Sequence, residues 1–143
     1  MNDNMLHFPL EKKEVTSLLK ANGITPTRQR LEIAYHLFQK QQHVSAERIL
    51  EKVNEQGNAV SRATVYNTMA LLTRKGLVRE VLIDRERVFY DSNSLPHHHF
   101  YNVDTGELSD VEGSAEIDMS NISGLPEGLH VVDTDVVIRV SQR

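Results

Sequence analysis

Apolar residues recur every three or four positions in four stretches of the first half of the chain, and this period is typical of amphipathic helices. The last three stretches follow a hydroxyl residue able to cap a helix N-terminus, and three of the four end at a glycine. We therefore predict helices near residues 10–22, 28–38, 46–56 and 62–75, with Thr27, Ser45 and Ser61 as caps and Gly23, Gly57 and Gly76 as stops.

After residue 76 the pattern changes to short runs of β-branched and aromatic residues. Residues 77–83 and 87–91 form two such runs, and the polar segment 84–86 between them predicts a hairpin turn. Helices followed by a hairpin predict a winged helix-turn-helix with the hairpin as its wing. Further on, a strand carrying Asp110 should follow a turn at 105–106. Alternating apolar residues over 131–140 predict a last strand, whereas 113–128 shows no long helix.

The composition limits the classes of protein and the metal ligands that are possible. The 143 residues suffice for one ordinary domain or two small ones, and no apolar run is long enough to cross a membrane. The first eight residues do not resemble a secretory signal, so we expect a cytoplasmic protein with no membrane partner. The absence of cysteine excludes disulfides, thiol nucleophiles and thiolate zinc sites. Any metal must be held by His, Asp and Glu.

Charge divides the chain in two. The net charge of −4 argues at first against nucleic acid, but residues 1–91 hold 14 basic and 11 acidic residues, whereas 92–143 hold 2 and 9. Because the helical pattern ends near the same place, we predict an α+β protein of two domains. A winged helix-turn-helix DNA-binding domain spans 1–91, a hinge spans 92–96, and a small, acidic α/β domain spans 97–143.

The fourth predicted helix is the candidate reader of DNA. Recognition helices place their N-terminal residues at base edges, with phosphate donors nearby. Arginine and asparagine make paired hydrogen bonds to purine edges, and the N-terminus of the second helix favours an anion. The candidate DNA-binding residues are Arg28, Arg30, Ser61, Arg62, Thr64, Tyr66 and Asn67. An ordinary solvated helix with ordinary arginines is the simpler alternative.

A run of three histidines, 97–99, is the strongest chemical feature. On a strand His97 and His99 would share one face and form half of a metal site, with His98 on the other face. The missing ligands could come from Asp91 at the end of the wing, Asp110 on the next strand and His43 in the loop before the third helix. Such a donor set suits Fe(II), Mn(II) or Zn(II). A solvated loop is the alternative.

At this point the chain resembles the ferric uptake regulator (Fur) superfamily of dimeric, metal-responsive transcription factors. The resemblance runs from about residue 18 to residue 140. Its motifs are GITPTRQR at 23–30, HVSAE at 43–47, SRATVYNT at 61–68, FYD at 89–91 and HHHF at 97–100.

The resemblance implies a regulatory metal site made of His43, Asp91, His97, His99 and Asp110. It also implies that 97–143 is the dimerisation and metal-sensing domain, whose last strand could pair across the dimer. Metal would fix the angle between the domains, so that a homodimer matches two half-sites of a pseudo-palindromic double-stranded DNA operator. Many members have a second site, for which His98, Glu116 and Asp135 are the candidates here.

The chain also departs from the family. Asn102 and Thr105 stand where many relatives carry the first Cys-x-x-Cys pair, so no Cys-bound structural zinc is expected. Thr25 replaces a basic residue that in some relatives reaches the minor groove. The missing cysteines, the three-histidine run and Asn67-Thr68 look most like the iron response regulator (Irr) branch. That branch responds to haem as well as metal, which would make the protein an iron- or haem-dependent regulator of iron homeostasis. With no Cys-Pro motif, haem would have only imidazole ligands.

Two other functions fit part of the pattern. A peroxide sensor of the same fold would use Fe(II) or Mn(II) at the same five residues and oxidise a ligand histidine. A His/Asp metallohydrolase would need an open metal position and a general base in a cleft, and would leave the wing and the recognition helix unexplained. We therefore expect a regulator and not an enzyme.

Overall fold

The computed structural model describes residues 6–55, 57, 59–112 and 122–143. The chain forms two compact units, Met1–Leu95 and Pro96–Arg143, and each is described by itself. The division falls inside the segment predicted as a hinge. Within the described part of the chain, no helix is both long enough and apolar enough to cross a membrane.

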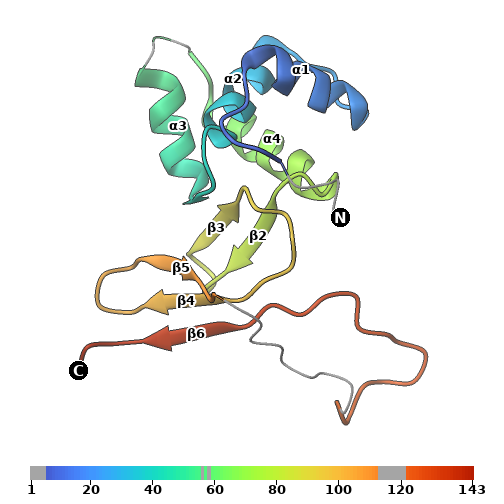
Figure 1. Cartoon of the computed structure of the whole chain (residues 1–143), viewed down its shortest axis with the longest axis vertical. Coiled ribbons are helices and arrows are strands. Elements are labelled where there is room, and N and C mark those ends of the chain that lie inside the picture. The colour runs from blue at the N-terminus through green and yellow to red at the C-terminus, as the bar shows by residue number, and fades with distance from the viewer. Residues whose placement is uncertain (1–5, 56, 58, 113–121) are drawn as a thin grey trace. The chain divides into compact units, whose positions relative to one another are not determined.

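Four helices make up most of the first unit: α1 (Lys12–Ala21), α2 (Arg28–Leu37), α3 (Ala46–Glu55) and α4 (Arg62–Arg74) (Figure 1). The three predicted caps are confirmed. Thr27 accepts the backbone N–H of Arg30, Ser45 that of Arg48 and Ser61 that of Thr64, at 3.3, 3.1 and 3.1 Å. Each hydroxyl satisfies an N–H that the helix itself cannot. The glycine after α1, Gly23, has a positive φ of 72°, which ends the helix at little steric cost.

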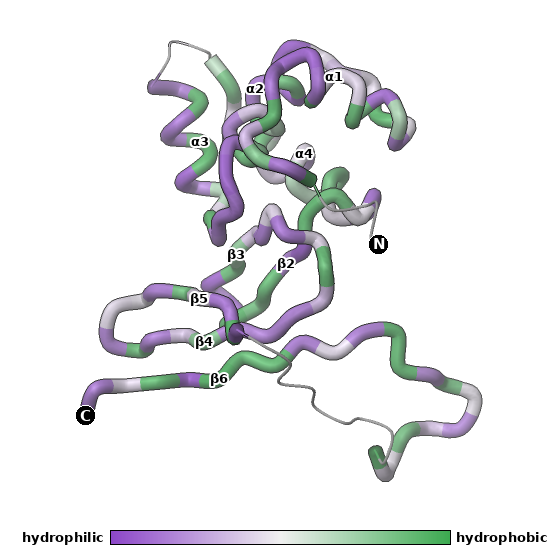
Figure 2. Tube along the Cα trace, in the orientation of Figure 1, coloured by the Kyte–Doolittle hydropathy of each residue, from purple (hydrophilic) through white to green (hydrophobic). Residues whose placement is uncertain are grey.

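The helices bury one apolar face each. Figure 2 shows apolar and polar positions alternating along α3, as the sequence pattern predicts. The largest fully buried apolar side chains of this core are Phe38, Leu19, Ile33, Leu37, Ile49, Met69 and Leu72. One face of α4 packs into this core, and the opposite face of its first two turns is exposed.

An antiparallel sheet completes the first unit. Its strands β1 (His43–Val44), β2 (Arg79–Leu82) and β3 (Val88–Asp91) lie in the order β1-β3-β2. The predicted hairpin corresponds to β2 and β3, and the Asp84 carboxylate accepts the N–H groups of Glu86 and Arg87 in its turn. The prediction of His43 in a loop is wrong, because His43 pairs with Asp91 in the two-residue strand β1.

The second unit contains a three-stranded sheet of β4 (His99–Asn102), β5 (Leu108–Asp110) and β6 (Val137–Val140), in the order β5-β4-β6. β4 pairs with β5 antiparallel and with β6 parallel. The last strand is shorter than predicted: Val131 and Val132 precede it and are 46% and 87% exposed. One edge of β6 is taken by β4 of the same chain. Part of the segment 113–128, expected to lack a long helix, lies outside the described residues.

Candidate functional site

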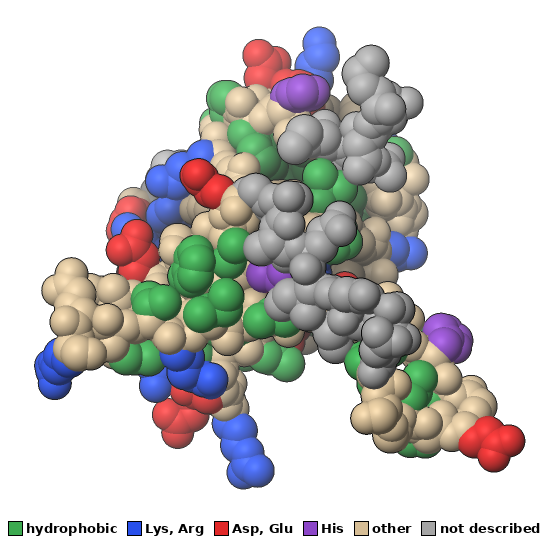
Figure 3. Space-filling model, turned by 60° about the horizontal axis from the view of Figure 1, so that its bottom comes forward, with side chains coloured by type: hydrophobic (Ala, Val, Ile, Leu, Met, Phe, Trp, Pro, Cys, Tyr) green, Lys and Arg blue, Asp and Glu red, His purple; other side chains and the backbone are tan. Residues whose placement is uncertain are grey.

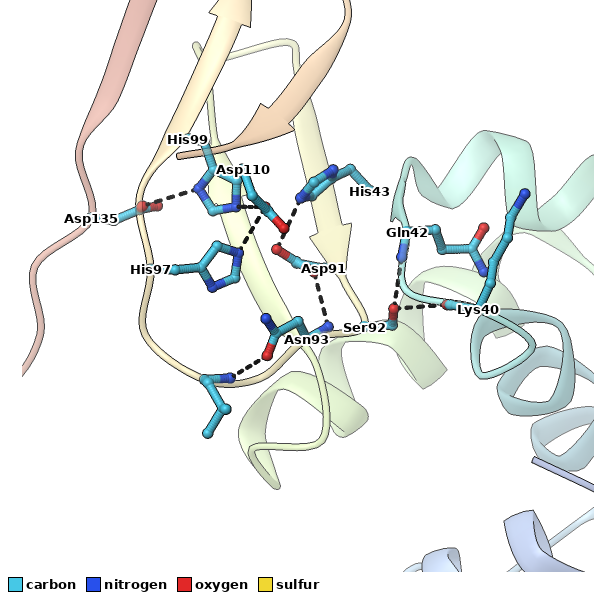
Figure 4. Close-up of polar contacts among 11 residues, drawn as sticks. Lys40, Gln42, His43, Asp91, Ser92, Asn93, His97, His99, Asp110 and Asp135 are labelled. Atoms are coloured by element: carbon cyan, nitrogen blue, oxygen red, sulfur yellow. Dashed lines mark hydrogen bonds and ion pairs between the residues drawn. The ribbon is translucent and has the colours of Figure 1, made fainter. Parts of the chain in front are cut away.

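The first unit holds a histidine–carboxylate pair built by β-sheet register. His43 and Asp91 are directly opposite each other on β1 and β3, and His43 Nε2 lies 3.1 Å from Asp91 Oδ2 (Figure 4). The Asp91 side chain is fully buried and that of His43 is 13% exposed. A buried carboxylate needs a positive or hydrogen-bonding partner, and here the imidazole provides one.

A hydrogen-bonded clasp next to this pair holds the two strands in register. The Ser92 hydroxyl donates to the carbonyl of Lys40 at 3.0 Å and accepts the Gln42 backbone N–H at 2.9 Å. The backbone N–H of Ser92 in turn donates to the Gln42 carbonyl. On the other side, Asp91 Oδ1 accepts the Asn93 N–H at 2.9 Å (Figure 4). These bonds fix the backbone of the residues directly before His43 and after Asp91.

The second unit contains a cluster of its own, made of His97, His99 and Asp110. Asp110 Oδ1 lies 3.0 Å from His97 Nε2 and 3.4 Å from His99 Nε2, and these ligand atoms are all within 4.8 Å of one another. The two imidazole rings pack with centroids 4.4 Å apart, and His99 is fully buried. Of the three histidines only His99 belongs to β4, so the strand on which His97 and His99 would share a face does not extend back to His97. The expectation that His97 and His99 turn to the same side agrees with their shared contact to Asp110.

The residues predicted for a second site are only partly described. His98 Nδ1 accepts a hydrogen bond from the backbone N–H of Val136 at 3.2 Å, so this nitrogen already has a hydrogen-bond partner. Asp135 Oδ1 lies 3.6 Å from His99 Nδ1, so this carboxylate approaches His99 (Figure 4). Glu116 lies outside the described residues.

The donors of both units fit a divalent metal ion. Imidazole nitrogens and carboxylate oxygens are the ligands that iron, manganese and zinc share. In each unit they are buried or half-buried and already face one another, and this costs desolvation free energy that a cation would offset.

The exposed face at the start of α4 carries the predicted DNA-binding side chains. Arg62, Tyr66 and Asn67 are exposed, whereas the Ser61 and Thr64 hydroxyls lie 2.9 Å apart and belong to the helix cap. At the start of α2, Arg28 is exposed and Arg30 Nη1 donates to the carbonyl of Thr25 at 3.1 Å. Hence Arg30, Ser61 and Thr64 also have structural partners within the chain.

Sequence reasoning missed Glu47, on the first turn of α3. Its carboxylate accepts a hydrogen bond from the Tyr66 hydroxyl at 2.9 Å and forms an ion pair with the Arg62 guanidinium. This contact raises the pKa of the Tyr66 hydroxyl, chiefly because the carboxylate prefers the protonated phenol. The only signal in the sequence is an acidic residue two positions after the Ser45 cap, which is also typical of any helix N-terminus.

Hydrogen bonds organise the turn that contains Asn102 and Thr105. Asn102 Oδ1 accepts the backbone N–H groups of Asp104 and Thr105 at 2.9 and 3.1 Å. The Asp104 carboxylate then binds the end of the chain, accepting the Ser141 hydroxyl at 2.9 Å and the Gln142 N–H at 3.0 Å. These bonds, the Gln142 N–H above all, lower the pKa of Asp104. The turn and the C-terminal segment are joined without any thiolate.

The second unit also exposes apolar surface. Val103, Leu129 and Ile138 are 48%, 62% and 40% exposed, and Figure 3, which turns the lower part of Figure 1 forward, shows apolar side chains gathered on the surface. Contiguous exposed apolar surface is typical of protein–protein interfaces.

Solved structures with this architecture define the class of the protein. The ferric uptake regulator of Pseudomonas aeruginosa with manganese is 28% identical in sequence, with a TM-score of 0.69 over 90% of this chain and 97% of that one. The ferric uptake regulator of Vibrio cholerae shares the fold at 20% identity and a TM-score of 0.66, covering 88% of this chain and 98% of that one. The fold is thus that of two-part α+β regulators with a DNA-binding and a dimerisation domain.

Sequence comparison then gives the family. Residues 21–139 match the ferric uptake regulator family, and the ferric uptake regulation protein of Pseudomonas aeruginosa is 32% identical over 130 residues, 89% of this chain and 96% of that protein. The peroxide-responsive repressor of Staphylococcus aureus is 26% identical over 126 residues, covering 88% and 82%. The chain belongs to the ferric uptake regulator family. This match confirms the predicted superfamily. Members of the family are dimeric, DNA-binding transcription regulators and not enzymes.

Proposed function

We propose that this protein is a dimeric transcription regulator that binds DNA when one divalent metal ion is held by His43, Asp91, His97, His99 and Asp110. The observation that carries the proposal is that each unit buries its own group of imidazole and carboxylate donors. Neither group alone offers the four to six ligands that these ions take, but together they offer five.

The proposed metal acts by selecting one arrangement of the two units. Bound metal supplies positive charge and joins ligands from both units. It therefore binds best where both groups reach it, and it shifts the population toward that arrangement. Moving an equilibrium from 1:99 to 99:1 requires about 10⁴-fold tighter binding to the favoured state. The Ser92 clasp contributes by holding His43 and Asp91 in place before metal arrives.

The first unit is the proposed DNA-binding domain, a winged helix-turn-helix with α4 as recognition helix and β2 and β3 as the wing. The exposed face of α4 presents Arg62, Tyr66 and Asn67, which suit base edges and phosphates. The second unit is the proposed dimerisation domain, supported by its exposed apolar side chains. Two copies would place two α4 helices on the half-sites of a pseudo-palindromic operator.

Within the family we assign the protein to iron homeostasis, with a metal ion as its signal. The resemblance to the Irr branch rests on sequence motifs alone. A haem ligand must present its imidazole toward a planar macrocycle, whereas His99 is fully buried against Asp110 and Asp135. The contacts of these histidines therefore favour a metal ion over haem.

Peroxide sensing is a second candidate. Similarity to peroxide-responsive repressors supports it, and the presence of Asp, not Glu, at positions 91 and 110 leaves it open. Peroxide treatment of the Fe(II)-loaded protein followed by mass spectrometry tests this function. Added oxygen on His43 or His97 would support it, and unmodified ligands would remove it.

The main proposal is tested by replacing two ligands at once. H97A/H99A should lose most of the Mn(II) binding heat in calorimetry, because only His43, Asp91 and Asp110 remain. The wild-type protein with Mn(II) should enrich a palindromic duplex from a random DNA library, and the variant should not. H7A/H130A, which removes two exposed imidazoles outside the set, is the control. Full Mn(II) affinity in H97A/H99A would show that the ligand assignment is wrong.

A further inference from the structure

Glu47 joins the two helices at the proposed DNA-binding surface. It lies on the first turn of α3, and its Oε1 atom receives both the Tyr66 hydroxyl and the Arg62 guanidinium from α4. Arg62 and Tyr66 are four residues apart, so they lie on the same face of α4. One acceptor therefore fixes two side chains that are both candidates for contact with DNA.

The contact has little to do with stability. The side chains of Arg62 and Glu47 are 63% and 47% exposed, Tyr66 is 43% exposed, and ion pairs at such exposure contribute little to the free energy of folding. A carboxylate on a surface that meets phosphates also weakens attraction to DNA of any sequence. An acidic group here is therefore unfavourable for general DNA affinity.

Orientation is what the carboxylate changes. Without it, the long Arg62 side chain is free to reach any nearby phosphate, and the Tyr66 ring is free to rotate. With it, the guanidinium and the phenol are held together and part of the arginine charge is offset. The Tyr66 hydroxyl is protonated at neutral pH, so it donates to Glu47 while its oxygen can still accept a hydrogen bond.

We propose that Glu47 is a specificity-determining residue that positions Arg62 and Tyr66 for reading base edges and limits their binding to phosphates. This inference rests on the proposed DNA-binding function of α4. It predicts that loss of Glu47 weakens discrimination between DNA sequences, while affinity for DNA of arbitrary sequence increases.

The experiment compares two duplexes at fixed salt. One is the duplex that the Mn(II)-loaded wild-type protein enriches from a random library, and the other is a scrambled duplex of the same composition. Fluorescence anisotropy gives the dissociation constant for each duplex, and the specificity ratio is the value for the scrambled duplex divided by the value for the enriched duplex. This ratio is measured for the wild type, E47A, E47Q and the control E51Q. Glu51 lies on the same helix and pairs with Arg48, so E51Q removes an equal charge without touching Arg62 or Tyr66.

E47A should lower this ratio about tenfold, a change of the size expected when one paired base contact is lost. E47Q keeps an oxygen acceptor for Tyr66 and should fall between E47A and the wild type, while E51Q should keep the wild-type ratio. With the scrambled duplex, the plot of log binding constant against log salt concentration should be steeper for E47A than for the wild type. The increase should be at most about 0.9, the slope that one additional phosphate contact contributes. In a double-mutant cycle, Y66F should add little to E47A, because both remove the same contact.

Other results separate the two proposals. If the wild type enriches no duplex, the proposed DNA-binding function fails. If the wild type discriminates and E47A keeps the same ratio, Glu47 has no role in specificity. If E47A, E47Q and E51Q all raise affinity for both duplexes equally, only net charge matters, and the positioning role is refuted. Circular dichroism of each variant checks that the helices remain folded.

Discussion

Replacing Ser92 with alanine should destabilise the first unit far more than an ordinary serine substitution. Ser92 is 2% exposed, and its hydroxyl makes two hydrogen bonds, to the Lys40 carbonyl and from the Gln42 N–H. A hydrogen bond contributes about 1 kcal/mol, and the buried Ser92 hydroxyl makes two of them. We therefore expect S92A to lower the free energy of unfolding by about 2 kcal/mol.

Urea denaturation followed by circular dichroism at the helix band measures this loss, because all the described helices belong to the first unit. With a slope of about 1.2 kcal/mol per molar urea, the midpoint should fall by about 2 M. S17A is the matched control, because Ser17 is exposed on α1 and bonds only within its helix, to the Lys13 carbonyl. A midpoint for S92A equal to that of S17A would refute the clasp. Because the clasp flanks His43 and Asp91, Mn(II) affinity should fall in S92A as well.

The remaining predictions concern the second unit and the core. The Gln142 N–H is the chief cause of the lowered pKa of Asp104 in the folded protein. The ionised carboxylate therefore stabilises the folded state above about pH 4, and this stabilisation is lost as the pH falls through the pKa that Asp104 has in the folded protein. The amide resonance of Gln142 should shift with a midpoint below about pH 3.9, and D104N should abolish that shift; a midpoint above that pH would contradict the contact. L72A should lower the free energy of unfolding in urea denaturation by about 2–5 kcal/mol, because the Leu72 side chain of α4 is fully buried in the core. A loss under about 1 kcal/mol would mean that Leu72 does not anchor α4 there.

Local signals in the sequence predicted the helices of the first unit well. Thr27, Ser45 and Ser61 cap their helices because the hydroxyl–backbone bond depends only on residues three positions apart. The strand containing His43 was missed because two residues show no periodicity. Its pairing depends on Asp91, which lies 48 positions away. The last strand was predicted too long because its valines alternate from residue 131, whereas pairing occurs only opposite the four residues of β4.

The candidate site followed from residue chemistry more than from local structure. The sequence predicts His97, His99 and Asp110 as metal donors, and the structure brings these three together in the second unit. Glu47 was not predicted, because an exposed acid on a helix resembles any solvated residue until its neighbours on another helix are known. Which side chains from separate elements share an acceptor is a property of tertiary packing, and it has no counterpart in spacing along the chain.

The bonds from Asp104 to Ser141 and Gln142 bear on which signals the protein ignores. A turn closed by thiolates and zinc would come apart under chelation or thiol oxidation, and its assembly would follow the zinc supply of the cell. A turn closed by a carboxylate and backbone amides responds to neither. The scaffold of this regulator is therefore insulated from two common stresses, and what it reports should depend on the histidine and aspartate donors alone.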